Sequence, residues 1–341
     1  MIRASAKPAD FVHATKGWRP NPDSWLLVAL LVACVAANSA FVPYYFSLSN
    51  LLDATRAGGE LGLLGLGMTV VMLIGGIDLS IGSIFALSAM IMGIAVKGGV
   101  GLPAAIVLGL ATGICAGAVN GLIVTRLRLP PIVVTLATMA VYRGMTVGIS
   151  GGESYPIPDT ISFLGQGSIA GIPTQLILLL VLTTVTAFVL RHTTYGLFLQ
   201  AIGTNETAAG FAAIPVALLK VSVYAISGLF CALASLVYVS RVVSAKADFG
   251  IGYELDAVTV AVLGGATLSG GRANVVGTVI AVMLIVFLRR GLTMAFVGTD
   301  IQTMIIGAIL IVAVAARNFG SLRQAWRRRR RGGPISSSDI D

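Results

Sequence analysis

Long apolar runs recur along most of the chain, and each is closed by charged, glycine or proline residues. A bilayer-spanning helix needs about 20 mostly apolar residues. Of the 341 residues, 56% are hydrophobic and only 11% are charged, too few charges to cover a soluble protein of this length. The sequence therefore predicts an all-α polytopic membrane protein, in which helices satisfy their backbone hydrogen bonds internally.

About ten membrane segments are predicted from these runs, and two of them are too short to cross alone. The short ones are 61–74 and 255–268, and both are interrupted or ended by glycine. The full set of predicted segments divides the chain into an N-terminal segment (1–23), a transmembrane domain (24–317) and a basic tail (318–341). The predicted segments are 24–42, 61–74, 81–96, 102–125, 131–147, 172–190, 214–239, 255–268, 274–288 and 301–315.

The net charge of +9 comes largely from the two ends of the chain. Basic residues beside apolar spans mark the cytoplasmic side, so both termini are expected in the cytoplasm. Arg289 and Arg290 do not fit, because this orientation places them toward the outside. Arg143, near the end of its span, must reach an interface or a polar partner. No basic face interleaved with aromatics is visible, so nucleic acid is not an expected partner. The terminal basic residues are Arg3, Lys7, Lys16, Arg19, Arg323 and 327–331.

The segment GGIDLSIGS, residues 75–83, places a carboxylate inside a predicted membrane helix. A charge at mid-bilayer costs roughly 2.5–3.5 kcal/mol on insertion scales, so Asp78 should face the protein interior or water. Two interpretations stay open. Asp78 either fixes a helix break, with Ser80 capping the next helix, or touches solute on the transport path. The candidate residues of this break are Gly75, Gly76, Asp78, Ser80 and Ser83.

A similar pattern returns later in the chain. Residues 69–80 read TVVMLIGGIDLS, and 259–269 read TVAVLGGATLS, with one residue of gap. Paired, glycine-interrupted apolar segments point to a binding or transport path in transporters. We therefore predict two discontinuous helices and a possible internal repeat, parallel or inverted. Thr267 stands where the first copy has Asp78, and the other candidates are Gly264, Gly265, Ser269 and Gly270.

The polar interval 191–213 is too polar to span a membrane. Thr204 or Asn205 can cap a short helix there, with Glu206 in its first turn. Such a helix on the basic side either docks a partner or simply connects two spans.

Three blocks together resemble one family: GGIDLSIGS at 75–83, AIGTNETAAGFAAIPV at 201–216 and GYELDAVTVAVLGGATLSGG at 252–271. The chain is similar, from about residue 60 to 315, to the membrane permeases of bacterial ABC importers for monosaccharides. This group includes the ribose and autoinducer-2 permeases. Where the family usually has a Gly-Ile pair, this chain has Ala213 and Ile214 followed by Pro215, which leaves the end of the short helix open.

The resemblance implies a multi-pass protein of the bacterial inner membrane, surrounded by lipid, that moves a monosaccharide or sugar-like solute. It implies three partners: a cytoplasmic ATP-binding subunit, a periplasmic solute-binding protein and a second permease chain, identical or related. It also implies that a cytoplasmic loop contacts the ATPase. That loop corresponds here to Gly203, Thr204, Asn205, Glu206, Ala208 and Ala209.

The sequence predicts no enzyme, cofactor or metal site. It has no GxxxxGK[ST] phosphate loop, and its two histidines allow no Ser-His-Asp set within the spans. The three cysteines have no metal-ligand spacing. Two other classes stay open: a gradient-driven secondary transporter, which would use Asp78 as its ion site, and a membrane enzyme acting on lipids.

Overall fold

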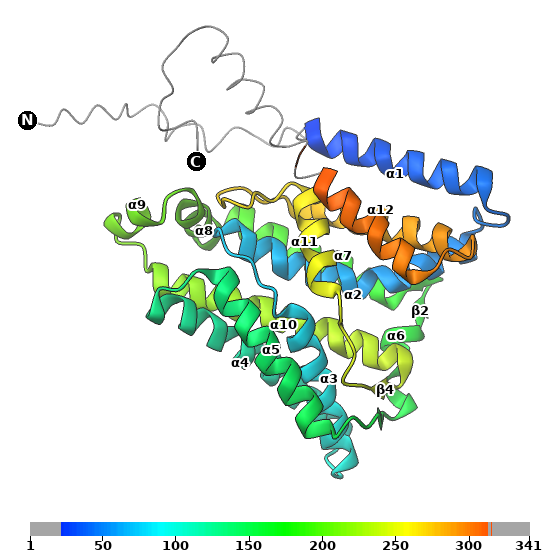
Figure 1. The fold of residues 1–341 in the computed structure, drawn as a ribbon, viewed down its shortest axis with the longest axis horizontal. Coiled ribbons are helices and arrows are strands. Elements are labelled where there is room, and N and C mark those ends of the chain that lie inside the picture. Colours follow the sequence, from blue (N-terminus) through cyan, green and yellow to red (C-terminus); the bar gives the residue numbers. More distant parts are fainter. Residues whose placement is uncertain (1–21, 313–314, 316–341) are drawn as a thin grey trace, which may run out of the picture.

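The computed structural model describes residues 22–312 and 315, and is almost entirely helical (Figure 1). The predicted N-terminal segment 1–23 and the basic tail 318–341 lie largely or wholly outside the described residues. The main helices are α1 (Pro22–Phe41), α2 (Leu48–Leu73), α3 (Ile81–Lys97), α4 (Leu102–Leu127), α5 (Pro131–Ser150), α7 (Thr174–His192), α8 (Thr194–Thr204), α9 (Glu206–Phe211), α10 (Val216–Val242), α11 (Tyr253–Gly264) and α12 (Val275–Met294).

By length and composition, six of the described helices can cross a membrane: α2, α4, α5, α7, α10 and α12. Shorter apolar helices cover Trp25–Phe41, Ile81–Lys97 and Thr299–Val312. Each predicted membrane segment overlaps a helix, with α11 on 255–268. The all-α polytopic class is confirmed, whereas the count of ten spans stays a prediction.

The prediction that 61–74 is too short to span is wrong. Its helix, α2, begins at Leu48 and has 26 residues. The charged residues that interrupt the apolar pattern have partners inside the protein: Glu60 is fully buried and its Oε1 lies 2.8 Å from Nε of Arg241. Arg56 donates to the Gln166 carbonyl at 2.5 Å. A search for apolar runs therefore underestimates the length of a helix whose charged residues are paired with other parts of the protein.

Helix α2 forms the centre of the bundle. It packs against α10, α12, α11 and α7, and in Figure 1 it lies between the α1–α12 side and the group of α3, α4, α5 and α10. In the most apolar stretch of α2, 89% of the residues are buried, whereas in the corresponding stretches of α4, α5 and α7 only 22–28% are buried. The peripheral helices therefore present apolar faces to their surroundings, as expected for lipid or another subunit.

The two ends of the bundle carry different structures. Helices α8 and α9 lie at one end, and the polar segment 150–171 lies at the other (Figure 1). At that second end β1 (Tyr155–Pro156) pairs antiparallel with β4 (Ser244–Ala245), and β2 (Ser168–Ile169) pairs with β3 (Ile172–Pro173). A short helical stretch, η2 (Asp159–Ile161) and α6 (Ser162–Gln166), joins them.

The arginines that the sequence left unexplained have partners. Arg143 donates to the carbonyls of Ala247 and Phe249, at 3.0 and 2.7 Å, so of the two predicted alternatives it has the polar partner. Arg289 forms an ion pair with Asp256 at 2.9 Å. Arg290 Nε lies 2.6 Å from Asn50 Oδ1. Because Arg289 and Arg290 bond to other helices, they are poor guides to the side of the membrane on which α12 ends.

Glycines let α4 and α10 cross at backbone contact. A Cβ atom placed on Gly113 would meet the Gly228 carbonyl oxygen, and one on Gly228 would meet the Gly113 carbonyl. One on Gly117 would meet the Tyr224 carbonyl. Small residues at helix crossings are the usual means of close packing in membranes.

Candidate transport site and coupling segment

The α2–α3 connection is a helix break closed by a glycine. Gly75 has φ +76° and its N–H donates to the Met72 carbonyl at 3.0 Å. The N–H of Gly76 donates to the Val71 carbonyl at 3.1 Å. This pair of bonds is a Schellman ending, which favours glycine in the left-handed position. The chain then runs as a short irregular segment until α3 begins at Ile81.

Asp78 lies at the centre of this irregular segment and is fully buried. Its Oδ1 accepts hydrogen bonds from the backbone N and the Oγ of Ser80, at 3.0 and 2.6 Å. Its Oδ2 accepts one from Ser227 Oγ of α10, at 3.1 Å. The carboxyl group is thereby enclosed by donors from the protein, as a buried acidic group requires.

Two further helices extend this polar network. Asn120 Nδ2 of α4 donates to Ser80 Oγ at 2.7 Å, and Tyr142 OH of α5 donates to Asn120 Oδ1 at 3.1 Å. Thr135 Oγ1 of α5 donates to the Ile77 carbonyl at 3.0 Å. Sequence reasoning missed these supporting residues. For Asn120 the sequence did carry a signal, because it is an amide within an otherwise apolar run, and the structure shows that it is fully buried.

Ser80 does not cap α3 with its side chain, contrary to the sequence prediction. It occupies the N-cap position with helical dihedral angles, and its hydroxyl donates to Asp78 instead. Ser83 Oγ donates back to the Ser80 carbonyl at 2.7 Å. The reason is local competition, because the Asp78 carboxyl is the better acceptor within reach of the hydroxyl.

The second break, between α11 and α12, ends its first helix in the same way. Gly265 has φ +110° and donates to the Val262 carbonyl at 3.0 Å, and Ala266 N donates to the Ala261 carbonyl at 2.9 Å. The shared geometry aligns Gly265 with Gly75 without a gap, so the one-residue gap in our alignment falls after the turn. Beyond this local match, an internal repeat stays a prediction.

The loop after Gly265 is shaped by Thr267. Its Oγ1 donates to the Gly270 carbonyl at 2.6 Å, and Asn274 then caps α12 by accepting from Gly277 N at 3.1 Å. Gly264 packs against α12, where an added Cβ would meet Thr278 N. Ser269 is exposed on the loop.

The short helix predicted from Glu206 is confirmed as α9. Asn205 is its cap and accepts from Ala208 N at 2.9 Å, whereas Thr204 bonds back to the Gln200 carbonyl within α8. Glu206, in the first turn, pairs with Lys220 of α10 at 2.6 Å. The sequence had not predicted α8, which precedes this cap directly.

Helix α9 ends on a residue that is unusual for its conformation. Ala213 has φ +59°, and its N–H donates to the Gly210 carbonyl at 3.1 Å. Ile214 N donates to the Ala209 carbonyl at 3.2 Å. This is again a Schellman ending, now with alanine in the left-handed position where the resembling family usually has glycine.

One face of α9 is open to its surroundings. Ala208 is exposed and Ala209 is buried against the bundle, so the helix has distinct inner and outer sides. Phe211 is 89% exposed at its end. Sequence reasoning overlooked Phe211, because an aromatic beside an apolar run does not reveal its exposure.

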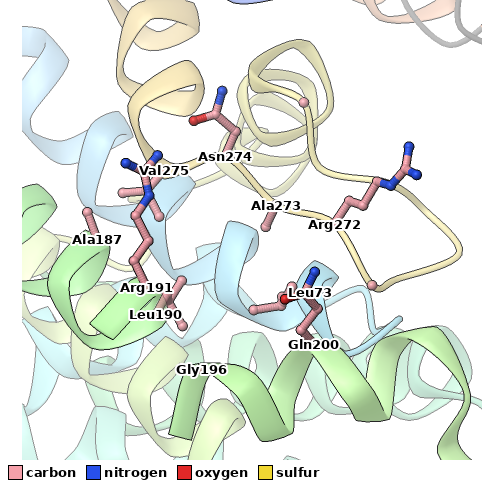
Figure 2. Close-up of a pocket in the computed structure, with 12 residues that line it drawn as sticks. Leu73, Ala187, Leu190, Arg191, Gly196, Gln200, Arg272, Ala273, Asn274 and Val275 are labelled. Atoms are coloured by element: carbon pink, nitrogen blue, oxygen red, sulfur yellow. The ribbon is translucent and has the colours of Figure 1, made fainter. Parts of the chain in front are cut away.

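The structure brings the two breaks together with the end of α8. The Gly271 N–H donates to the Leu73 carbonyl at 2.9 Å, and a Cβ on Gly203 would meet both groups. A pocket of about 310 Å³ lies beside this contact. Leu73, Gln200 of α8, Ala273 and Arg191 of α7 line it, and Figure 2 shows Leu73 and Gln200 close together in the view, with Ala273 above them and Arg191 to one side. Asp78, Ser80 and Ser83 form the separate network described above.

The family described as the permease component of the branched-chain amino acid transport system matches residues 50–314. The chain belongs to this permease family. No solved structure matches the chain.

Named relatives of this permease are bacterial import permeases. The ribose import permease protein RbsC of Escherichia coli (strain K12) is 34% identical over 315 residues, which cover 90% of this permease and 96% of the relative. RbsC of Bacillus subtilis (strain 168) is 38% identical over 275 residues, covering 80% and 85%. The autoinducer 2 import system permease protein LsrD of Escherichia coli (strain SMS-3-5) is 34% identical over 319 residues, covering 91% and 97%.

Proposed function

We propose that this permease is the transmembrane subunit of an ATP-binding cassette importer for a monosaccharide or sugar-like solute. The observation that carries the proposal is the similarity to ribose and autoinducer 2 import permeases over nine-tenths of the chain. The family description names amino acids, but the relatives RbsC and LsrD carry the names of ribose and autoinducer 2 import. The permease itself is not an enzyme, and its energy comes from a separate ATPase subunit.

The ATPase docks on the outer face of α9, at the cytoplasmic end of the bundle. Support comes from the capped, exposed helix and from Phe211, a large apolar side chain that is 89% exposed. An exposed aromatic at a helix end suits an anchor that fills a partner's pocket. The opposite end, with β1 and β4, faces the periplasmic binding protein, and a second permease chain completes the complex in the inner membrane.

The docking site is tested by co-purification of the ATPase with tagged permease from membranes. Ala208→Asp and Phe211→Asp are expected to abolish the association while membrane insertion is retained. Phe296, 97% exposed near the end of α12, provides the matched control. Phe296→Asp is expected to keep the ATPase, and an unchanged complex with both α9 variants would contradict this assignment.

Transport is tested in liposomes that contain the permease and ATPase, with the binding protein added outside. Uptake is expected to require ATP hydrolysis and to be unaffected by collapse of ion gradients. Uptake by the permease alone, driven by a proton or sodium gradient and lost in Asp78→Asn, would instead establish a secondary transporter.

A further inference from the structure

Four glycines bring three separate segments into backbone contact. The segments are the end of α2, the end of α8 and the loop between α11 and α12. Gly203, the penultimate residue of α8, has no room for a side chain, because a Cβ there would meet the Leu73 carbonyl oxygen and the Gly271 nitrogen. We call this contact the glycine junction, and it consists of Leu73, Gly75, Gly203, Thr204, Gly270 and Gly271.

The junction is a close contact between backbones. A Cβ on Gly270, which has φ +83°, would lie 2.7 Å from Gly75 N and 2.8 Å from the Gly203 carbonyl oxygen. The 2.9 Å hydrogen bond from Gly271 to Leu73 joins the two helix breaks directly. The three segments meet through backbone atoms and the Thr204 side chain, so displacement of one must move the others or break the contact.

The junction lies immediately before α9, the helix on which we propose that the ATPase docks. α8 ends at Thr204, Asn205 caps α9, and only Asn205 separates the two helices. The other side of the junction is open to the 310 Å³ pocket of Figure 2, which Leu73, Gln200 and Gly271 line. The packed side can thus transmit movement, and the pocket leaves room for it.

We propose that Gly203, Gly270 and Gly271 are positioning residues that transmit movement of α9 to both helix breaks. This inference rests on the proposed function, since α9 moves with the ATPase that docks on it. Coupling of this kind requires a contiguous set of rigid elements, and the glycine junction supplies one. The resemblance placed Gly203 in the loop that contacts the ATPase, but the proposed docking uses the outer face of α9, and none of the three glycines lies on α9. We therefore assign them a role distinct from docking.

The decisive variant is Gly203→Ala, and its matched control is Gly144→Ala. Gly144 of α5 is also helical, but among the described residues nothing lies within 4 Å of a Cβ placed there. In liposomes with ATPase and binding protein, Gly203→Ala is expected to retain the ATPase but to lower uptake per ATP hydrolysed by about tenfold. Gly144→Ala is expected to keep both at the wild-type level.

Unchanged uptake per ATP in Gly203→Ala would overturn the inference while leaving the proposed function intact. Loss of ATPase association in Gly203→Ala, with normal association in Gly144→Ala, would also overturn it, since the residue would then serve docking. Failure of the unaltered permease to bind any ATPase would contradict the proposed function itself. These three results are separable in one set of preparations.

A spectroscopic measurement covers the case in which Gly203→Ala does not fold. Spin labels are placed on exposed positions in a background without the natural cysteines: Thr207 on α9, Leu268 on the loop and Phe163 at the opposite end. On ATP binding, the Thr207–Leu268 distance is expected to stay constant while both distances to Phe163 change together. A change in the Thr207–Phe163 distance with a constant Leu268–Phe163 distance would overturn the inference.

Discussion

Ser227 Oγ on α10 donates a 3.1 Å hydrogen bond to Asp78 Oδ2 in the α2–α3 break. The two residues are 149 positions apart in the chain, and both are fully buried. The bond therefore joins a helix break to a helix that passes through the core. In this conformation the Asp78 carboxyl is held by Ser80 and Ser227, which favours its interpretation as the residue that fixes the break.

The first prediction concerns this bond. Asp78→Ala leaves the Ser80 and Ser227 donors buried without an acceptor, which costs about 1–3 kcal/mol for each group. The midpoint of thermal unfolding of the solubilised protein is expected to fall. In Asp78→Ala the further change Ser227→Ala is expected to cost less than it does alone, because the bond is already gone. Additive losses in this double-mutant cycle would contradict the coupling.

The second prediction compares two buried tyrosines. Tyr142 OH donates to the Ala116 carbonyl at 3.0 Å and to Asn120 at 3.1 Å. Within the described part of the chain, the Tyr224 hydroxyl has no hydrogen-bond partner. Tyr142→Phe is expected to lower the free energy of unfolding by about 1 kcal/mol, and Tyr224→Phe to leave it unchanged or raise it. Equal thermal shifts would count against the network.

The third prediction concerns the end of α9. An L-residue in the left-handed conformation of Ala213 is strained by about 1 kcal/mol, which glycine relieves. Ala213→Gly is therefore expected to raise the thermal midpoint without changing ATPase association. Gly210→Ala, a change inside α9, serves as the comparison for the thermal midpoint. A destabilised Ala213→Gly protein would show that α9 does not end in this way.

The fourth prediction concerns the crossing of α4 and α10. Gly228→Val forces the helices apart and is expected to cost about 1–3 kcal/mol, as overpacking of a core does. Gly148→Val on α5, where a Cβ has nothing within 4 Å, is the control and is expected to leave folding intact. Comparable losses in the two variants, measured by thermal unfolding, would mean that the close crossing is unimportant.

The sequence predicted the class, the helix positions and the short helix α9, because apolar runs, breakers and caps act locally. It did not predict the true start of α2, since Glu60 is accommodated only by Arg241 of a distant helix. The alignment of the two breaks had the same limit. Both contain Gly-Gly, but only the backbone shows that Gly75 corresponds to Gly265.

The residues of the candidate site also fall into two groups: those that local rules identify and those that only tertiary packing brings together. Capping rules, which need only neighbouring residues, identified Glu206 and left Thr204 and Asn205 as alternative caps. The partners of Asp78 and Ser80 come from α4 and α10, and no pattern in the sequence relates Ser227 to position 78. The meeting of Gly203 with Gly271 is likewise a product of tertiary packing, although both glycines stand in motifs that the sequence marks separately.

The bonds of Arg289 and Arg290 bear on how the chain is assembled. Asp256 and Asn50 both precede them in the sequence, so the ribosome has already made each partner when α12 emerges. We therefore expect α12 to enter the bilayer when both acceptors, Asp256 on α11 and Asn50 on α2, are already in place. The order of synthesis would then provide these two arginines with polar partners, as water does for charged residues in a loop.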